Sequence, residues 1–314
     1  MIDAIDIGGT YIKIGLVKNG LILDNTSVKA HSEIEFHNTI NAIEQTIDQL
    51  LIKNSIPKNN IEGIGIGFPG LVDSVQMKVL STNKKYDDAV GFDFIQWGKE
   101  TYDIPIFLEN DARIALLGEW QYGAGRGIDN IVMLTFGTGI GSATLINGKL
   151  LKGKHFQAGN LGGHFTINLN GYKCTCGNLG CVEAEASTWK LADLLQSDSR
   201  YKDSLIKGKT LDFKSLFKFA SEGGELSKVV RDHCLEVWSA GVINQIHAYD
   251  PELIILGGGI MKSAEIIVPF IREKVKDHAW TPWGEVKIIE SKIPNESALL
   301  GAYYLVLNKL NHED

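Results

Sequence analysis

Apolar strands and turn residues follow one another in the same order in two separate parts of this chain. Residues 4–23 read AIDIGGTYIKIGLVKNGLIL, and residues 132–151 read VMLTFGTGIGSATLINGKLL. Each copy predicts a strand, a Gly-Thr turn, a second strand, an Asn-Gly hairpin turn and the start of a third strand. Aligned without a gap, both turns coincide: Gly9-Thr10 with Gly137-Thr138, and Asn19-Gly20 with Asn147-Gly148. The pattern predicts two related halves.

Helical and strand patterns alternate after each hairpin pattern. A helix over 38–54 places five Ile and Leu side chains on one face, and a helix over 226–249 is apolar almost all round, so we expect it to be buried. Short apolar runs predict strands over 61–68, 105–108 and 253–256, and further helices are expected over 112–122 and from about residue 263. This order predicts an α/β protein.

The chain of 314 residues and 34.5 kDa fits two domains better than one. The segment 123–127, which reads GAGRG, is the flexible-looking stretch near the middle. We therefore expect a small N-terminal lobe of residues 1–120, completed by a C-terminal helix at about 300–314. Residues 121–299 are expected to form a larger lobe.

Net charge, the length of the apolar runs and the cysteine spacing exclude several classes of protein. The formal net charge is −7, and Lys13, Lys84 and Lys85 are too sparse to form a basic stripe for nucleic acid. No signal segment follows Met1, and the apolar runs are too short to span a bilayer. Three of the four cysteines lie within residues 174–181, unlike a secreted disulfide framework. We expect a cytoplasmic protein that binds neither nucleic acid nor a membrane.

The two Gly-Thr turns suggest phosphate binding. Such a turn leaves backbone N–H groups uncovered by side chains and adds a hydroxyl donor, which suits a phosphate oxygen. One turn alone is as easily explained as a hairpin. Two in register indicate two domains that bind one polyphosphate.

A second group of residues has the composition of a zinc site. His164, Cys174, Cys176 and Cys181 lie within a short glycine-rich segment, and three thiols with one imidazole complete a tetrahedral zinc shell. With no position left open, the predicted zinc is structural. The alternative is a set of unconnected buried thiols. The fourth cysteine, Cys234, lies in the apolar helix and is expected to pack in the core.

These segments resemble the ROK family of repressors, open reading frames and sugar kinases. The resemblance rests on the zinc segment from His164 to Glu183 and on the motifs DIGGT (6–10), END (109–111), TFGTGIG (135–141), LGGG (256–259) and LGA (300–302), all in the family's order. It covers essentially the whole chain. It implies an actin-like, ribonuclease H-like ATPase fold, with two lobes that close around ATP and a hexose, and a homodimer.

The phosphate residues follow from the motifs and the resemblance together. Asp6 ends its strand beside the glycine turn, where a carboxylate is suited to hold Mg²⁺ directly or through water; the alternative is an ordinary strand-end residue. The residues expected to bind the phosphates are Gly8, Gly9, Thr10, Gly137, Thr138 and Gly139. Gly257, Gly258 and Gly259 resemble the loop on the adenosine side, although glycine there also suits a strand-to-helix turn.

Asp111 is the expected catalytic residue. Transfer of a phosphoryl group to a hydroxyl needs positioning, charge neutralisation and an acceptor for the hydroxyl proton. A carboxylate at a strand end can accept that proton. The alternative is that Asn110 or Asp111 caps the next helix, worth about 1 kcal/mol. The resemblance to the family's Asn-Asp pair favours the general base.

The resemblance also implies the sugar contacts, which are Gly70, Thr82, Asn110, Asp111, His164 and Glu183. His164 would bind zinc through one nitrogen and a sugar hydroxyl through the other. Family kinases carry Glu-x-Gly-His before the zinc segment, whereas this chain places Leu161 or, allowing one extra residue, Asn160 at the Glu position. Asn160 is preferred because AGNLG tracks the usual AGELG. An amide donates as well as accepts hydrogen bonds and is uncharged, so the sugar identity stays open.

The leading hypothesis is an ATP- and Mg²⁺-dependent kinase of the primary hydroxyl of a hexose or hexose derivative. One alternative is a sugar-responsive transcriptional regulator, but only five residues precede Asp6, which leaves no room for a DNA-reading helix. The other is a catalytically weak sugar-binding paralogue, which the change at Asn160 keeps open. The particular sugar, donors other than ATP and the oligomeric state do not follow from the sequence.

Overall fold

The computed structural model of the chain describes residues 1–31, 35–82 and 85–311. The chain forms two compact units. The first unit contains Met1–Gly127, Lys152–Ala158 and Lys292–Asp314, and the second contains Ile128–Leu151 and Gly159–Ser291. Lys84 and residues 312–314 of the expected C-terminal helix lie outside the described residues.

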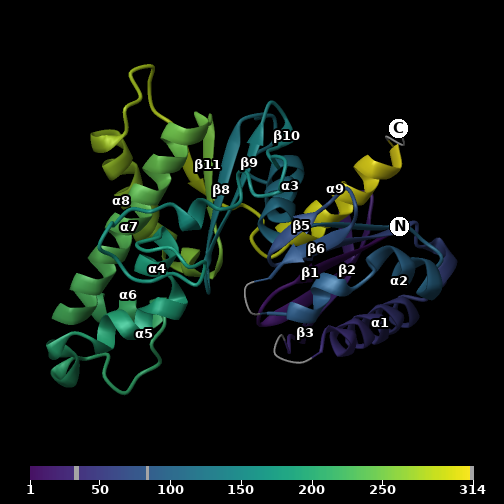
Figure 1. Cartoon of the computed structure of the whole chain (residues 1–314), viewed down its shortest axis with the longest axis horizontal. Helices are drawn as coiled ribbons and strands as arrows, with labels where there is room; N and C mark the ends of the chain where they lie inside the picture. Colours follow the sequence, from purple (N-terminus) through teal and green to yellow (C-terminus); the bar gives the residue numbers. More distant parts are fainter. Residues whose placement is uncertain (32–34, 83–84, 312–314) are drawn as a thin grey trace. The chain divides into compact units, whose positions relative to one another are not determined.

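The first unit contains a five-stranded sheet in the order β3-β2-β1-β4-β7. Figure 1 labels three of these strands, β1, β2 and β3. Its strands are β1 (Ile2–Ile7), β2 (Tyr11–Lys18), β3 (Leu21–Lys29), β4 (Gly63–Phe68) and β7 (Ile106–Asn110). Strand β2 is antiparallel to β1 and β3, whereas β4 is parallel to both β1 and β7. Asn19 and Gly20 have φ values of 53° and 73°, which confirms the predicted hairpin turn. A separate two-stranded hairpin joins β5 (Leu71–Asp73) to β6 (Lys78–Ser81).

Helices cover both faces of this sheet. They are α1 (Phe36–Lys53), α2 (Phe94–Thr101), α3 (Asp111–Tyr122) and α9 (Ser297–Asn311), with short 3-10 turns at Lys58–Asn60 and Asp87–Gly91. The predicted apolar stripe of α1 is buried in the same core as Ile5 and Ile7 of β1. Helix α9 packs on the opposite face, where a Cβ atom at Gly63 would lie 2.8 Å from Val306. Glycines in the strands therefore let α9 approach the sheet closely.

Helices α3 and α9 touch through their backbones. A Cβ atom on Gly301 would overlap the carbonyl oxygen of Ile114, and one on Gly118 would overlap the carbonyl oxygen of Ser297. This contact fixes α3, which begins at Asp111, against the C-terminal helix.

The second unit repeats the same sheet order, β10-β9-β8-β11-β12. Its strands are β8 (Ile131–Phe136), β9 (Ile140–Ile146), β10 (Lys149–Leu150), β11 (Leu253–Gly257) and β12 (Lys287–Glu290). Strands β8, β9 and β10 are antiparallel, and β11 is parallel to β8 and β12. Asn147 and Gly148 have φ values of 50° and 70°. The two related halves that the repeat predicts are therefore present.

The helices of the second unit are α4 (Val182–Ala186), α5 (Thr188–Gln196), α6 (Phe213–Ser221), α7 (Glu225–Tyr249) and α8 (Ala264–His278), with 3-10 turns at Gly162–His164, Ser199–Asp203 and Gly259–Ser263. Trp238 of α7 stacks on Phe136 of β8 at 5.2 Å between ring centroids. Its indole donates a hydrogen bond to the carbonyl oxygen of Ala186, at 2.9 Å. Burial of α7 is incomplete, because Val229 is 46% exposed. The all-round burial expected from its sequence is wrong for that side of the helix.

No helix within the described residues combines the length and the apolar content that a membrane span requires.

The α3–α9 contact predicts a stability difference between two glycine-to-alanine substitutions. We expect Gly301→Ala to lower the free energy of unfolding by about 1–3 kcal/mol, because the added methyl group forces two packed backbones apart. Gly91→Ala is the matched control, since its Cβ atom would meet nothing within 4 Å, and its change should stay within about 0.5 kcal/mol. Urea unfolding measures both, and equal losses would contradict the close contact.

Candidate functional site

The predicted site residues of the first unit gather at one edge of its sheet. Strands β1, β4 and β7 are parallel, and their register pairs Asp6 with Gly67 and Gly67 with Glu109. The three strands therefore end at the same level. The Gly8–Thr10 turn follows β1, and Gly70 lies two residues after the end of β4. Asn110 is the last residue of β7, and Asp111 begins α3.

The Gly8–Thr10 turn is closed by one of its own N–H groups. Gly8 donates to the carbonyl oxygen of Tyr11 at 3.0 Å, and a Cβ atom at Gly8 would lie 2.6 Å from that oxygen. The N–H of Gly8 is thus used inside the turn, contrary to the expectation that the turn leaves its N–H groups free. The N–H groups of Gly9 and Thr10 have no acceptor among the described residues, so these two remain available to an anion.

Asn110 holds the pair Asn110-Asp111 in place. Its side-chain oxygen accepts from the N–H of Arg113 at 3.2 Å and caps α3, so the capping alternative is confirmed for Asn110. Its amide donates to the carbonyl oxygen of Gly70 at 3.0 Å and to Oδ1 of Asp111 at 2.9 Å. The N–H of Ala112 also donates to Oδ1, at 2.8 Å. Oδ2 of Asp111 accepts no hydrogen bond within the described chain and is the oxygen free to take a proton.

The carboxyl groups at this edge titrate at unusually high pH. Burial raises the pKa of Asp111 to about 7, and the charge of Asp6 adds to the shift. Burial also raises the pKa of Asp6, against the charge of Lys13. Lys13 is opposite Asp6 in the register of β1 and β2, which places its charge near this carboxyl group. A carboxyl group with a pKa near neutrality is suited to act as a general base.

Gly70 and Thr82 lie side by side. Gly70 has a φ of 130°, and a Cβ atom there would lie 3.4 Å from Cα of Thr82. The hydroxyl of Thr82 donates to the carboxylate of Asp87. The structure therefore brings together all the first unit's predicted sugar residues, while the Thr82 hydroxyl already has a protein partner.

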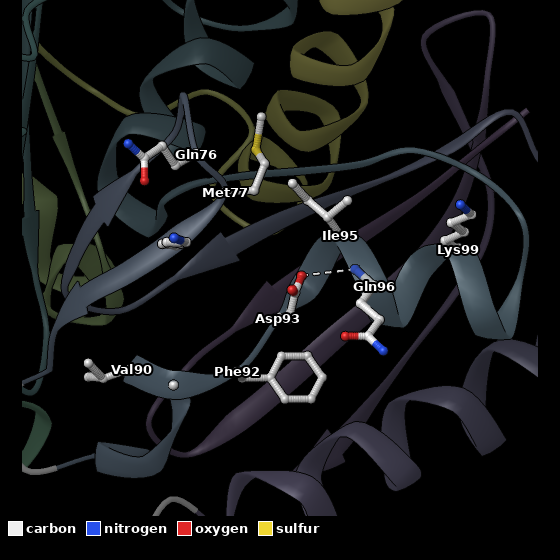
Figure 2. Close-up of a pocket in the computed structure, with 10 residues that line it drawn as sticks. Gln76, Met77, Val90, Phe92, Asp93, Ile95, Gln96 and Lys99 are labelled. Carbon is white, nitrogen blue, oxygen red and sulfur yellow. Dashed lines mark hydrogen bonds between the residues drawn. The ribbon is translucent and has the colours of Figure 1, made fainter.

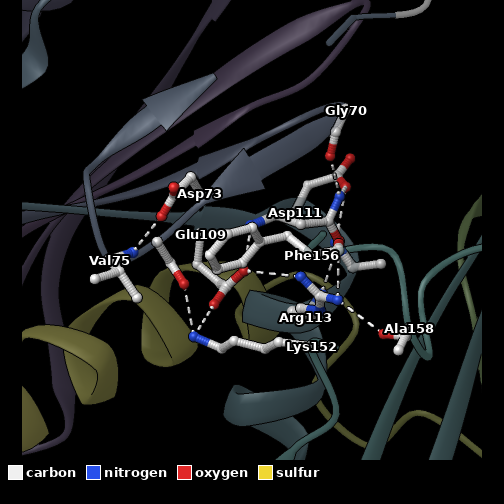
Figure 3. A network of polar contacts seen from close by, with 12 residues as sticks. Gly70, Asp73, Val75, Glu109, Asp111, Arg113, Lys152, Phe156 and Ala158 are labelled. Atoms are coloured by element: carbon white, nitrogen blue, oxygen red, sulfur yellow. Dashed lines mark hydrogen bonds and ion pairs between the residues drawn. The ribbon is translucent and has the colours of Figure 1, made fainter. Parts of the chain in front are cut away.

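Glu109, Arg113 and Lys152 form an ion network next to the Asn110-Asp111 pair (Figure 3). Glu109 and Arg113 are fully buried, with 3.4 Å between Oε1 and Nη1. Lys152 lies 2.6 Å from Oε2 of Glu109 and 2.6 Å from the hydroxyl of Ser74. Arg113 also donates to the carbonyl oxygen of Ala158 at 2.8 Å. The network joins the segment Lys152–Ala158 to β7 and α3.

The second Gly-Thr turn is closed in the same way as the first. Gly137 donates to the carbonyl oxygen of Gly139 at 3.0 Å, and the N–H groups of Thr138 and Gly139 have no acceptor in the described part of the chain. Glu183 lies against this turn, since its Oε2 accepts from the N–H of Ile140 at 2.8 Å. A Cβ atom on Gly139 would collide with that carboxylate. The structure thus places the predicted sugar residue Glu183 beside a predicted phosphate turn.

Gly257, Gly258 and Gly259 end β11 next to the second turn. Gly257 pairs with Thr135 of β8. Gly258 has a φ of 92°, and a Cβ atom there would collide with the backbone of Phe136. Gly259 meets nothing within 4 Å of its Cβ position. Close packing therefore requires glycine at position 258, whereas the Cβ position of Gly259 faces open space.

The four predicted metal ligands form one cluster. The ligand atoms of His164, Cys174, Cys176 and Cys181 all lie within 4.8 Å of one another. Nδ1 of His164 is the nitrogen that faces the thiols, at 3.5 Å from Sγ of Cys174. The cluster has the donor set and spacing of a metal site, which excludes the alternative of unconnected thiols. Cys234 is fully buried in α7, as predicted.

Asn160 precedes this cluster by a short distance along the chain. Its side-chain oxygen is buried and accepts no hydrogen bond among the described residues. Gly162 then packs against Gln245 of α7, whose buried amide is likewise without a partner there. Unpaired buried polar atoms are costly, so Asn160 has hydrogen-bonding capacity left for a ligand.

A surface pocket of the first unit lies apart from these residues in the sequence (Figure 2). Its lining comes from β6, α2 and the residues next to them, among them Met77, Phe92 and Gln96. None of its ten lining residues is a predicted phosphate, sugar or metal residue, so it adds nothing to the candidate site.

Sequence reasoning missed two lysines near the site. Lys152 binds Glu109, and the side chain of Lys85 lies along Gly9, with its Cε atom 3.1 Å from the Cβ position there. Neither lysine belongs to a motif, and both come from loops distant in sequence. A buried Glu109 in the END motif was the available signal, because a buried carboxylate requires a cation.

Known proteins resemble this chain over nearly its whole length. A model of the ROK family matches residues 2–309. The chain is 32% identical to a glucokinase of Thermotoga maritima, over 98% of this chain and 97% of that protein. It is 29% identical to the xylose repressor of Bacillus subtilis, over 97% of this chain and 76% of the repressor. The structure of a ROK family glucokinase from Streptomyces griseus, in complex with glucose and AMPPNP, matches with a TM-score of 0.81 and 25% identity, over 98% of this chain and 99% of that one.

The ion network predicts a stability loss at Lys152. We expect Lys152→Met to lower the free energy of unfolding by about 1–3 kcal/mol, because Glu109 then loses a charged partner while buried. Lys149→Met, at an exposed position of β10, is the matched control and should change little. In urea unfolding, the double variant Lys152→Met/Glu109→Gln should lose less than the sum of the single losses. Strict additivity would show that the pair does not interact.

Proposed function

Because the chain belongs to the ROK family, we propose that it is an ATP- and Mg²⁺-dependent kinase of the primary hydroxyl of a hexose or hexose derivative. One observation carries the proposal: Asp111, a carboxyl group with a free oxygen and a pKa of about 7, lies at the same edge of the sheet as the Gly8–Thr10 turn, in which two N–H groups have no acceptor among the described residues. The similarity to a glucokinase across the whole chain supports it.

In the proposed reaction, Oδ2 of Asp111 accepts the proton of the sugar hydroxyl. The hydroxyl oxygen forms a bond to the γ-phosphorus of ATP, and the bond from that phosphorus to the β,γ-bridging oxygen breaks, which releases ADP and the sugar phosphate. The free N–H groups of Gly9 and Thr10, with those of Thr138 and Gly139, would bind phosphate oxygens. Gly257, Gly258 and Gly259 would face the adenosine. Each unit then supplies one lobe of an actin-like fold.

Two metals fit the residues. Asp6 offers a carboxylate beside the first turn and would hold Mg²⁺, which neutralises phosphate charge when bound. The donor set of three thiols and Nδ1 of His164 suits structural Zn²⁺. The zinc would fix the imidazole so that Nε2 binds a sugar hydroxyl, together with Gly70, Thr82, Asn110, Asn160 and Glu183. From the family resemblance we also propose a cytoplasmic homodimer.

A sugar-responsive regulator is the second candidate, because the xylose repressor is 29% identical over 97% of this chain. A weak sugar-binding paralogue is the third, because Asn160 replaces the family's Glu. ADP release over a panel of glucose, mannose, fructose, allose, glucosamine, the N-acetyl amino sugars and a β-glucoside separates them. Sugar-dependent ADP release supports the kinase. Sugar binding without ADP release, in calorimetry, would replace it by the paralogue, and a sugar-dependent DNA mobility shift would replace it by the regulator.

Asp111 predicts the pH dependence of the reaction. The general base works as a carboxylate, and its pKa is about 7, so kcat/KM should rise with pH through about 7 and then level off. Asp111→Ala should lower kcat by about 10²–10⁴-fold. Asp111→Asn is the folding control: above pH 7 it should be at least as stable as the natural protein, because it removes a carboxylate that the folded state ionises with difficulty. Full turnover in Asp111→Ala would remove this residue from the mechanism.

The metal cluster predicts a zinc requirement that can be measured without an activity assay. Plasma emission spectrometry should find about one zinc per chain, the number that one set of four ligands holds, and Cys176→Ser should lose most of it and unfold at lower temperature. Cys234→Ala is the control, because that thiol lies in α7 outside the cluster, and it should keep its zinc. Where Cys176→Ser retains turnover, the sugar KM should rise more than kcat falls. An unchanged zinc content in Cys176→Ser would contradict the four-ligand site.

A further inference from the structure

Lys85 lies across the first Gly-Thr turn. It belongs to the connection between β6 and the 3-10 turn Asp87–Gly91. Its Cε and Cδ atoms lie 3.1 and 3.2 Å from the position of a Cβ atom on Gly9, and its Nζ lies closer still. The absence of a side chain at Gly9 therefore makes room for the end of this lysine.

Tyr86 fixes the position of Lys85 relative to the turn. The Tyr86 hydroxyl donates to the carbonyl oxygen of Gly8 at 3.0 Å. The ring is 1% exposed and packs edge-on against Phe36, with 5.8 Å between centroids. Because Tyr86 is buried and hydrogen-bonded to the turn, it holds the preceding residue, Lys85, close to Gly9.

The ammonium of Lys85 has no ion pair among the residues that the structure describes. Its charge nevertheless reaches Asp111, where it opposes the rise in pKa caused by burial and by Asp6. This positive charge lies beside the N–H groups of Gly9 and Thr10, which have no acceptor among the described residues. These three groups together are suited to an anion with several oxygens, as in a nucleotide's terminal phosphate.

We propose that Lys85 binds the phosphoryl group that is transferred. The inference rests on the proposed kinase function and names a further residue for it. As the hydroxyl oxygen bonds to the γ-phosphorus and the bridging oxygen leaves with ADP, negative charge stays on the oxygens of the transferred group. Lys85 neutralises that charge, while Asp111 takes the hydroxyl proton. A lysine that binds the γ-phosphate favours ATP over ADP, because ADP lacks that phosphate group.

The test compares Lys85→Met with Lys85→Arg and with the control Lys78→Met, an exposed lysine on β6. We expect Lys85→Met to lower kcat by about 100-fold, the usual loss for one group that stabilises transition-state charge, with the sugar KM within about threefold. Lys85→Arg keeps the positive charge, so its kcat should be about tenfold higher than that of Lys85→Met. Lys78→Met should behave as the natural protein.

Calorimetric titration with ATP and with ADP separates this role from a structural one. Lys85→Met should weaken ATP binding and leave ADP binding unchanged, so that the natural preference for ATP disappears. Equal losses for both nucleotides, an unchanged kcat, or no preference for ATP in the natural protein would overturn the proposal. If no sugar supports ADP release but Lys85→Met still abolishes the preference for ATP, the kinase proposal fails and the contact with the terminal phosphate stands.

Discussion

The register of three parallel strands determines which groups meet at the candidate site. Asp6 pairs with Gly67, and Gly67 pairs with Glu109, so β1, β4 and β7 end at one level. A shift of one residue in either pairing would turn every side chain to the opposite face of the sheet. Asp6 and Asp111 are therefore held near one another by backbone hydrogen bonds along whole strands. Gly67 leaves the space beside them, since its Cβ position lies 3.5 Å from Asp6 and 3.6 Å from the Asp111 backbone.

Burial at this edge of the sheet makes the carboxyl groups of Asp6 and Asp111 harder to ionise, and a raised pKa is useful in a general base. Burial disfavours the charged form of Asp111 and raises its pKa to about 7, and the nearby charge of Asp6 adds to that rise. Three groups oppose this rise in pKa: the amide of Asn110 and the N–H of Ala112, both next to Asp111 in the chain, and the ammonium of Lys85, which comes from a distant loop. The same edge of the sheet thus holds a carboxyl group with a pKa near neutrality and a cation, and the buried ion network of Glu109 lies next to Asn110.

The local sequence pattern was sufficient to predict much of the fold and the site residues that lie close together in the sequence. The Asn-Gly turns need positive φ and almost no context, so the hairpins and the repeat followed directly. The Cys-rich segment is short enough that spacing alone identified the metal cluster. Contacts between residues far apart in the sequence could not be predicted in this way. Lys152 pairs with Glu109, and Lys85 lies against Gly9, only because two loops fold back onto the sheet. The resemblance to a family located Asp111 and Glu183, whereas the capping by Asn110 and the contact of Glu183 with the second turn needed coordinates.

The first unit is built from three separate segments of the chain, so it cannot finish folding until the third segment, which contains α9, has been synthesised. Its last strand is β7, but one face of β4 is covered by α9, which follows the whole second unit along the chain. During synthesis, the face of β4 that carries Gly63 and Gly65 is therefore expected to stay uncovered until α9 leaves the ribosome. The second unit lies between these segments and can form its core first. We therefore expect nascent chains to expose an incomplete first sheet until α9 is synthesised, and transiently exposed apolar surface of this kind is what chaperones bind.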